Sequence, residues 1–231
     1  DIDNIFINMD DFEPTKSLIG KGQFGEVYKI VSKIDKKEYA IKYINIDPHN
    51  ATKDIQKSFM RELFILYHLK HPAIVQFKGG NLNPTVFHPS IVTEYLPNGS
   101  LNDFINNTKL NSTQKLIILL GISSAMKYVH KENVIHRDLK PDNILLDKNL
   151  YPRICDFGLS RFFDTSSKQA KTIEMSFMIG TPLYFSPEKM KDGHVYGPSS
   201  DVYAFSLIAY FVVTGLSPFY EQKFLNIFNL F

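Results

Sequence analysis

The segment from Val134 to Leu146 carries the side chains with the clearest chemistry. Asp138 is followed two residues later by Lys140 and five residues later by Asn143, in one loop between apolar runs. Thirteen residues after Asn143 comes Asp156, which opens the sequence Asp-Phe-Gly. Carboxylate and amide oxygens are the hard ligands that Mg²⁺ accepts beside substrate phosphates. Any one of these residues alone is better explained as a turn or cap residue, but their order together predicts a magnesium site.

A glycine cluster, Gly20-Lys21-Gly22-Gln23-Phe24-Gly25, lies near the start of the chain. Glycines expose backbone N–H donors to phosphate oxygens without a Cβ in the way. A dinucleotide-binding loop of the Rossmann type would open a helix directly after the cluster. The segment Glu26–Val31 is instead β-branched and aromatic, which predicts a hairpin. From this motif alone, a hairpin turn without a ligand stays open.

Lys42 ends the apolar run Tyr39-Ala40-Ile41 on the next predicted strand. A lysine on such a strand needs an anionic partner, because burial of an unpaired charge is costly. Glu62, on the following amphipathic helix, supplies one candidate and a nucleotide phosphate another. Taken singly, Lys42 reads as a surface lysine and Glu62 as a solvated helix charge.

The elements that would position these residues change in type along the chain. β-Branched and aromatic runs predict strands, and apolar residues spaced by three and four predict helices. The predicted strands are Thr15–Gly20, Glu26–Ser32, Glu38–Asn45, Ile74–Phe77 and Ile91–Tyr95. The predicted helices run from Thr52 to the stop at His71-Pro72, over Leu101–Asn106 and over Thr113–His130. A small β-rich lobe is therefore expected before a connector at Leu96–Asn98, and a larger helical lobe after it.

From about Phe12 to its end, the chain resembles a eukaryotic protein kinase catalytic domain. The family's signatures occur in order: the glycine loop, the strand lysine, H-R-D-L-x-x-x-N, D-F-G and the A-P-E variant Ser186-Pro187-Glu188. The resemblance implies an α+β, bilobal protein kinase-like fold with a small antiparallel β lobe, one helix in it, and a larger mainly helical lobe. The expected parts are an N-terminal extension (1–11), the small lobe (12–96) and the large lobe (97–231), lacking its C-terminal helices.

The resemblance also implies ATP and Mg²⁺ as cofactors and a role for each matched residue. Asp138 would orient the substrate hydroxyl, Lys140 would steady the γ-phosphate, and Glu62 would orient Lys42. Asn143 and Asp156 would hold the magnesium ions. The implied nucleotide-binding residues are Ile19, Gly20, Lys21, Gly22, Phe24, Gly25, Val27, Ala40, Lys42, Thr93, Glu94, Leu96, Ser100 and Leu145.

Two further segments bear on the type of kinase. Lys140 and the run Gly180-Thr181-Pro182 resemble the serine/threonine-specific pattern, and Ile91–Leu101 most resembles the tyrosine-kinase-like group. Arg137 resembles the arginine of kinases that activation-loop phosphorylation switches on. The candidate loop hydroxyls are Thr165, Ser166, Ser167, Thr172 and Ser176, of which Thr172 and Ser176 are preferred. Incidental hydroxyls in a polar loop are the alternative.

The segment Val202–Tyr220 contains no charged residue. Its length suggests a transmembrane helix, but Gly215 to Pro218 predicts a stop that leaves too short a span. A buried helix is therefore expected. Because Ser200–Ser206 resembles the start of the large lobe's central helix in the kinase family, the resemblance implies that Asp201 bonds to the catalytic-loop backbone. In the family, Glu188 pairs with a late arginine, but no arginine follows Arg161 here. A truncated domain, poorly soluble or inactive by itself, is expected for these 231 residues.

Composition narrows the remaining classes. The net charge of +2 gives no support to nucleic-acid binding, and the single cysteine, Cys155, favours a reducing, cytoplasmic compartment. The expected partners are protein substrates, with no membrane insertion and with regulatory domains outside these residues. A non-catalytic pseudokinase scaffold is the main alternative, and a small-molecule kinase is disfavoured by the peptide-positioning segment Gly180–Glu188.

Overall fold

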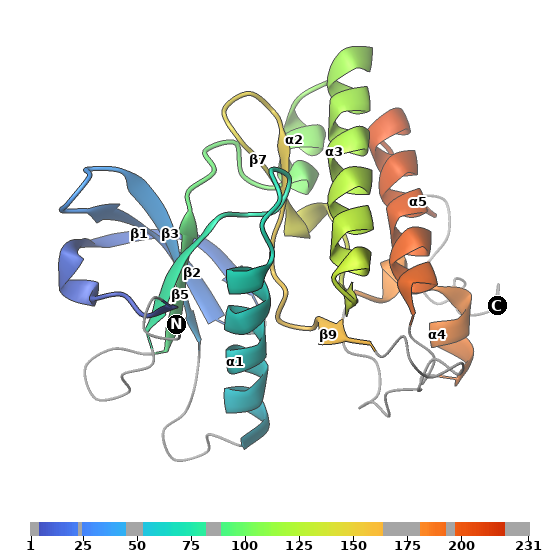
Figure 1. Cartoon of the computed structure of the whole chain (residues 1–231). Coiled ribbons are helices and arrows are strands. Elements are labelled where there is room, and N and C mark those ends of the chain that lie inside the picture. Colours follow the sequence, from blue (N-terminus) through green and yellow to red (C-terminus); the bar gives the residue numbers. More distant parts are fainter. Residues whose placement is uncertain are drawn as a thin grey trace. The chain divides into compact units, whose positions relative to one another are not determined.

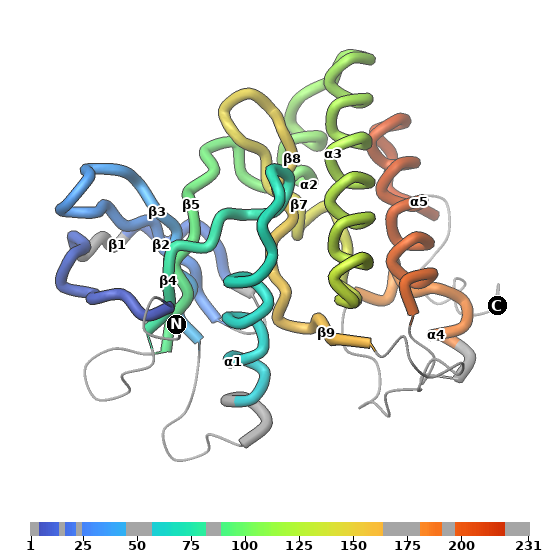
Figure 2. The backbone as a smooth tube through the Cα atoms, viewed as in Figure 1, coloured from blue at the N-terminus to red at the C-terminus, as the bar shows by residue number. Residues whose placement is uncertain are grey.

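The computed structural model describes residues 5–22, 25–44, 53–81, 89–163, 181–192 and 197–219 (Figure 1). The chain divides into two compact units, each with its own core. The first unit comprises Asp1–Lys70 and Val75–Pro97, and the second comprises His71–Ile74 and Asn98–Phe231. The backbone path of each can be followed in Figure 2.

An antiparallel sheet of five strands forms the first unit, in the order β1-β2-β3-β5-β4. The strands are β1 (Phe12–Gly22), β2 (Gly25–Ser32), β3 (Glu38–Ile44), β4 (Phe77–Asn81) and β5 (Ser90–Glu94). One face carries a core of Ile30, Tyr39, Ile41 and Val92. The predicted hairpin at the glycine cluster is confirmed, because Gly20 pairs with Val27 and Gly22 with Gly25 across β1 and β2.

The helix α1 (Lys53–His68) follows the predicted apolar spacing. Phe59, Leu63, Leu66 and the following Leu69 are all buried. The helix ends three residues before His71, as the His71-Pro72 stop predicts, because a residue before proline disfavours helical backbone.

The prediction of a strand at Ile74–Phe77 is wrong. The observed strand, β4, begins at Phe77 and continues through two glycines, which have low strand propensity and gave no signal. Ile74 instead makes an isolated parallel bridge to Ile154 in the second unit.

The second unit is mainly helical, with short strand pairs around its loops. Its helices are α2 (Leu101–Asn107), α3 (Ser112–Lys131), α4 (Pro187–Asp192) and α5 (Pro198–Thr214). Its strands are β6 (Val134–Ile135), β7 (Ile144–Leu146), β8 (Pro152–Ile154) and β9 (Arg161–Phe162), paired as β6-β9 and β7-β8. A capping box fixes the start of α3, since Asn111 and Gln114 bond reciprocally through side chain and backbone.

Helices α3 and α5 pack against each other (Figure 1). The predicted stop of α5 is confirmed: Gly215 follows the last helical residue with a φ of 75°, a left-handed cap. Among the described helices, none combines the length and apolarity needed to cross a bilayer. The expectation of burial on all sides is wrong, because Val202 and Val213 are more than half exposed while Ile208 and Phe211 are buried. The absence of charged residues therefore does not predict which face of α5 packs against the rest of the unit.

Candidate active site

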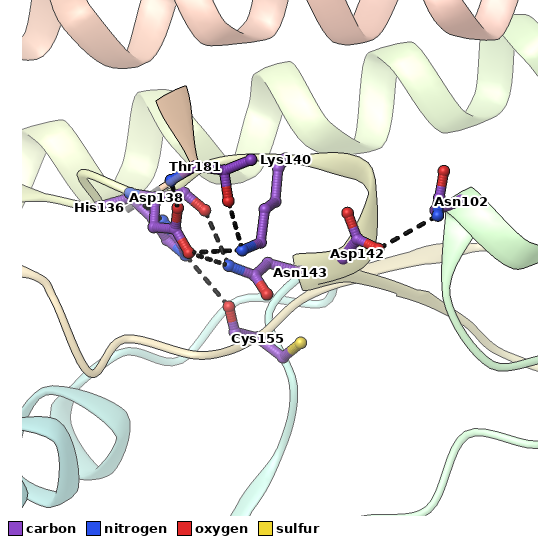
Figure 3. A network of polar contacts seen from close by, with 8 residues as sticks. All are labelled: Asn102, His136, Asp138, Lys140, Asp142, Asn143, Cys155 and Thr181. Atoms are coloured by element: carbon purple, nitrogen blue, oxygen red, sulfur yellow. Dashed lines mark hydrogen bonds and ion pairs between the residues drawn. The ribbon is translucent and has the colours of Figure 1, made fainter. Parts of the chain in front are cut away.

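Asp138, in the loop between β6 and β7, is held through both of its carboxylate oxygens (Figure 3). Oδ1 accepts a hydrogen bond of 3.0 Å from the backbone N–H of Thr181. Oδ2 accepts one of 3.0 Å from Asn143 Nδ2 and lies 3.0 Å from Lys140 Nζ. Fixed donors thus hold the carboxylate in one orientation, and Oδ1, with one donor, has a second lone pair that a further donor can use.

Asn143 is fixed by its amide nitrogen. Nδ2 donates to the Asp138 backbone carbonyl at 2.8 Å as well as to the Asp138 carboxylate. Because the nitrogen is committed to Asp138, the amide oxygen faces away from it and can act as a ligand. The Asn143 backbone carbonyl accepts from the N–H of Cys155, which ties this loop to the residue preceding Asp156.

The donor set around Asn143 and Asp156 suits a hard cation. Among the described residues, His, Cys, Asp and Glu side chains form no group of three that could hold a metal ion. Magnesium needs few protein oxygens, since it keeps waters and substrate phosphates in its shell. One carboxylate and one amide oxygen in the same unit therefore fit Mg²⁺ better than a transition metal.

Lys140 connects Asp138 to the segment after residue 180. Its Nζ donates to the Thr181 hydroxyl at 2.7 Å while it pairs with Asp138. Thr181 therefore contributes both a backbone donor to Asp138 and a hydroxyl acceptor to Lys140. These contacts bring together residues 41 positions apart in sequence.

Asp201, near the start of α5, anchors the backbone just before Asp138. Its carboxylate accepts 2.9 Å hydrogen bonds from the N–H groups of His136 and Arg137, and it contacts His130 Nε2 at 2.9 Å. The predicted bond between Asp201 and the loop backbone is confirmed. The side chain is 2% exposed, so these donors act without competition from water.

Two residues of the site have left-handed backbone, which side chains disfavour. The φ of Arg137 is 74° and that of Asp156 is 60°. Arg137 is held by Asp201 and by its Nη1, which donates to the carbonyl of Leu159 at 3.2 Å. Such strain is concentrated at functional sites, where the surrounding contacts maintain it.

In the first unit, Lys42 and Glu62 form the predicted pair. Nζ lies 2.8 Å from Oε1, and the side chains are 18% and 5% exposed. Strand register also places Val27 opposite Lys42 and Thr93 opposite Ala40. Because side chains alternate along strands, these four residues share one face of the sheet. Four of the residues assigned to the nucleotide thus share one face of the sheet in this unit.

The glycine cluster can adopt its hairpin because of Gly25. A Cβ there would collide with the backbone carbonyl of Tyr43, and its φ is 156°. Lys21 is largely exposed and pairs with Glu26 at 3.0 Å. Phe24 lies outside the described residues.

Other predicted nucleotide-binding residues occupy varied environments. Leu96 is buried, whereas Ile19 is 42% exposed. Gln76 N–H donates to the side chain of Glu94 at 2.8 Å. The hydroxyl of Ser100 caps α2 through Asp103, and Ser100 bridges to Leu145 by backbone.

The structure describes only some of the residues predicted to be regulatory. All five predicted loop hydroxyls, Thr165, Ser166, Ser167, Thr172 and Ser176, lie outside the described residues. Glu188 accepts a hydrogen bond of 3.2 Å from Ser200 of α5.

Sequence reasoning missed Lys189, a buried lysine beside the catalytic loop. Burial, and secondarily the charge of Arg137, lowers the pKa of Lys189 to about 7, although Asp138 and Asp201 oppose the shift. Burial also raises the pKa of Tyr184. His130 was missed as well, because a histidine inside a helix gives no sign of a distant carboxylate partner.

The described contacts of each unit suit the binding of charged groups. Asp138 can accept a proton, Lys140 can neutralise an anion beside it, and Asn143 with Asp156 can hold a cation. Lys42, oriented by Glu62, can bind a second anionic group. Such preorganised charges stabilise charge that develops during a reaction.

Comparison with known proteins identifies the matching family. The family model described as protein kinase domain matches residues 14–230 of the chain. This match confirms the expected α+β kinase fold. A probable serine/threonine-protein kinase of Dictyostelium discoideum is 37% identical over 205 residues, covering 88% of this chain and 21% of its own length.

Two further relatives come from a plant and an insect. Serine/threonine-protein kinase STY46 of Arabidopsis thaliana is 32% identical, with 87% of this chain and 33% of that protein covered. Serine/threonine-protein kinase fused of Drosophila melanogaster is 33% identical, with 93% and 25% covered. The chain therefore spans between about a fifth and a third of these relatives' lengths.

Proposed function

Because the chain belongs to the protein kinase domain family over residues 14–230, we propose that it is a serine/threonine protein kinase domain acting on protein hydroxyls with ATP and Mg²⁺. In this proposal, residues 12–96 and 97–231 are the small and large lobes of one catalytic domain. The observation that carries it is the fixed carboxylate of Asp138, with Lys140 and Asn143 on one of its oxygens.

The chemistry follows from these groups. The substrate hydroxyl oxygen bonds to the γ-phosphorus, the bond from that phosphorus to the β,γ-bridging oxygen breaks, and ADP leaves. Asp138 holds the hydroxyl and takes its proton, while Lys140 neutralises charge on the transferred group. Lys42, held by Glu62, binds the remaining phosphates. Magnesium, held by Asn143 and Asp156, would supply neutralisation of the phosphate oxygens.

Specificity for serine and threonine is supported by the Lys140–Thr181 contact and by the names of the relatives. Assignment to the tyrosine-kinase-like group rests on the resemblance of two segments, Ile91–Leu101 and His71–Gly79. Cytoplasmic location rests on the single cysteine.

Activation by loop phosphorylation is supported by the charges near the catalytic loop. Arg137 directly precedes Asp138, and its buried side chain donates to the Leu159 carbonyl at 3.2 Å, in the segment that leads into the loop. A phosphate on the loop would pair with Arg137 and order the loop. We expect phosphate at one of the five loop hydroxyls after incubation with ATP and Mg²⁺, detected by mass spectrometry. Unchanged activity after alanine substitution at all five sites would refute the regulation.

The kinase activity is tested by γ-phosphate transfer to a generic protein substrate by the full-length protein. Asp138→Asn and Asp156→Asn should each lower kcat by about 10² or more, because base and metal ligand are lost. Asp142→Asn is the matched control, since Asp142 is an exposed carboxylate of the same loop bonded to Asn102. Nucleotide binding without transfer would favour the pseudokinase scaffold, and transfer unaffected by Asp156→Asn would overturn the metal assignment.

A further inference from the structure

Residues Ile5–Asp11 precede the part of the chain that matches the family model, yet they are fixed on the first unit. The N–H of Ile7 donates to the Gly80 carbonyl of β4 at 3.1 Å, and Phe6 makes a parallel bridge to Gly80. At the other end, the Asp11 carbonyl accepts from Lys33 N–H at 2.7 Å. The segment thus contacts the edge strand β4 through an isolated bridge at Gly80.

Ile5 and Ile7 supply the apolar contacts of this segment. Ile5 is 4% exposed, and Ile7 packs on the core of Ile30, Tyr39, Ile41 and Val92. A segment held only by its backbone would leave these side chains in water. Burial of Ile5 and partial burial of Ile7 therefore make the segment part of the folded unit.

Two adjacent glycines, Gly79 and Gly80, leave β4 without side chains at the point where the segment contacts it. A Cβ at Gly79 would collide with Ile7 Cγ2 and lie 3.2 Å from Ile7 Cβ. A Cβ at Gly80 would collide with Leu63 Cδ1 of α1 and lie 3.4 Å from Leu63 Cγ. Since consecutive residues of a strand face opposite sides, Ile7 and Leu63 press on the two sides of the same short piece of backbone.

Strand register links this piece of backbone to Lys42. Gly80 pairs with Ile91, and Ile91 pairs with Lys42, so all three lie in one row across the sheet. Glu62, which precedes Leu63 on α1, pairs with Lys42 at 2.8 Å. The position of β4 relative to α1 therefore governs whether Glu62 reaches Lys42.

We infer that Ile5–Asp11 is a positioning segment: by packing Ile7 on Gly79, it holds β4 against Leu63 and keeps Glu62 on Lys42. Its consequence for catalysis rests on the proposed function, in which Lys42 binds phosphate. Release of the segment loosens α1 and weakens use of ATP, so any partner that captures residues 5–11 reduces activity.

The primary test is Ile7→Ala in the full-length protein, read by hydrogen exchange of the α1 amides and by kcat/KM for ATP. Exchange within α1 should rise, and kcat/KM should fall on the order of tenfold, a typical coupling between distant sites. Ile7→Val, which keeps the contact with Gly79, should restore both. Phe6→Ala is the control in the same segment, because Phe6 is 39% exposed and contributes its backbone.

A double-mutant cycle isolates the contact at β4. Gly79→Ala alone should expel the segment and loosen α1, because its methyl collides with Ile7 Cγ2. In the Ile7→Ala background, adding Gly79→Ala should change hydrogen exchange in α1 much less. The Cγ2 methyl of Ile7, with which the new Cβ would collide, is absent there. Equal effects of Gly79→Ala in both backgrounds would overturn the inference.

Ile30→Ala distinguishes a positioning role from a general loss of stability. This change weakens the same core but alters neither Ile7 nor the glycines of β4. Equal loosening of α1 in Ile30→Ala and Ile7→Ala at matched thermal stability would contradict a positioning role. Should the protein transfer no phosphate at all, the exchange measurements still decide this inference, and the proposed function alone fails.

Discussion

Lys189 lies under the ring of Phe185, with its Nζ 3.1 Å from the ring centre. The side chain is buried, and burial together with Arg137 lowers its pKa from 10.5 to about 7. The folded protein therefore releases a proton that the unfolded chain keeps between about pH 7 and 10.5.

This difference predicts a pH dependence of stability. Over that window the unfolded chain binds more protons, so the free energy of unfolding rises with pH as the cost of the buried charge is removed. Below about pH 7 the cost is fully present. In Lys189→Met the rise should be smaller, as measured by urea unfolding at several pH values. Lys148→Met, at an exposed turn position, should keep the wild-type slope; a slope unchanged in Lys189→Met would disprove the prediction.

At Thr181 the hydroxyl and the backbone N–H have separate partners, Lys140 and Asp138. Thr181→Val removes only the hydroxyl, and loss of a hydrogen bond to a charged group corresponds to about 1.5–3 kcal/mol. We expect kcat to fall by about 10- to 100-fold. Thr181→Ser keeps the hydroxyl and should retain most activity in steady-state kinetics. Similar losses in both variants would mean that the hydroxyl is not what matters.

At the level of elements, α5 fixes the catalytic loop through one buried side chain. Asp201 accepts from two backbone N–H groups with separate oxygens, Oδ1 for Arg137 and Oδ2 for His136. In Asp201→Asn one acceptor becomes a donor and leaves a buried N–H unsatisfied. The loop is then expected to lose its fixed backbone, including the left-handed Arg137.

The expected cost of Asp201→Asn is about 1–3 kcal/mol of unfolding free energy, the penalty of an unsatisfied buried group. Urea unfolding measures it, and phosphate transfer should fall in parallel. Ser206→Ala is the comparison on the same helix, where an exposed hydroxyl donates to the Tyr203 carbonyl. Equal stability of the Asp201→Asn and Ser206→Ala proteins would contradict this account of α5.

For the whole molecule, nucleotide binding under the proposed function is expected to stabilise the folded state. Ligand that binds only the folded state at about 100 times its Kd adds about 2.7 kcal/mol of stability. For a domain of this size, the thermal midpoint should rise by about 5–10 °C with ATP and Mg²⁺. The rise should fall after chelation with EDTA, and in Lys42→Met and Asp156→Asn.

Differential scanning fluorimetry measures this shift, with MgCl₂ alone as the blank. Asp142→Asn should retain the full shift, because its carboxylate is exposed and bonded only to Asn102 among the contacts described above. A shift that survives both Lys42→Met and Asp156→Asn would show that nucleotide binds elsewhere.

Local patterns sufficed for much of the fold and site. Alternation and helical spacing located most strands and helices, and the order of Asp138, Lys140, Asn143 and Asp156 led to the site proposed above. The bond from Asp201 to the loop was implied by the family resemblance and is confirmed. The strand prediction failed at β4, because Gly79 and Gly80 have low strand propensity. The burial prediction failed for α5, because an uncharged sequence does not distinguish its buried face from its exposed face.

The sequence by itself determined which chemical groups are present and which strands and helices can form, because spacing and side-chain type are local properties. Only the tertiary structure decided that Lys189 is buried beside Arg137, that Thr181 reaches both Asp138 and Lys140, and that Ile7 lies on Gly79. Each of these depends on packing between residues far apart in the chain. Burial and distance, which set pKa values and hydrogen bonds, exist only after that packing.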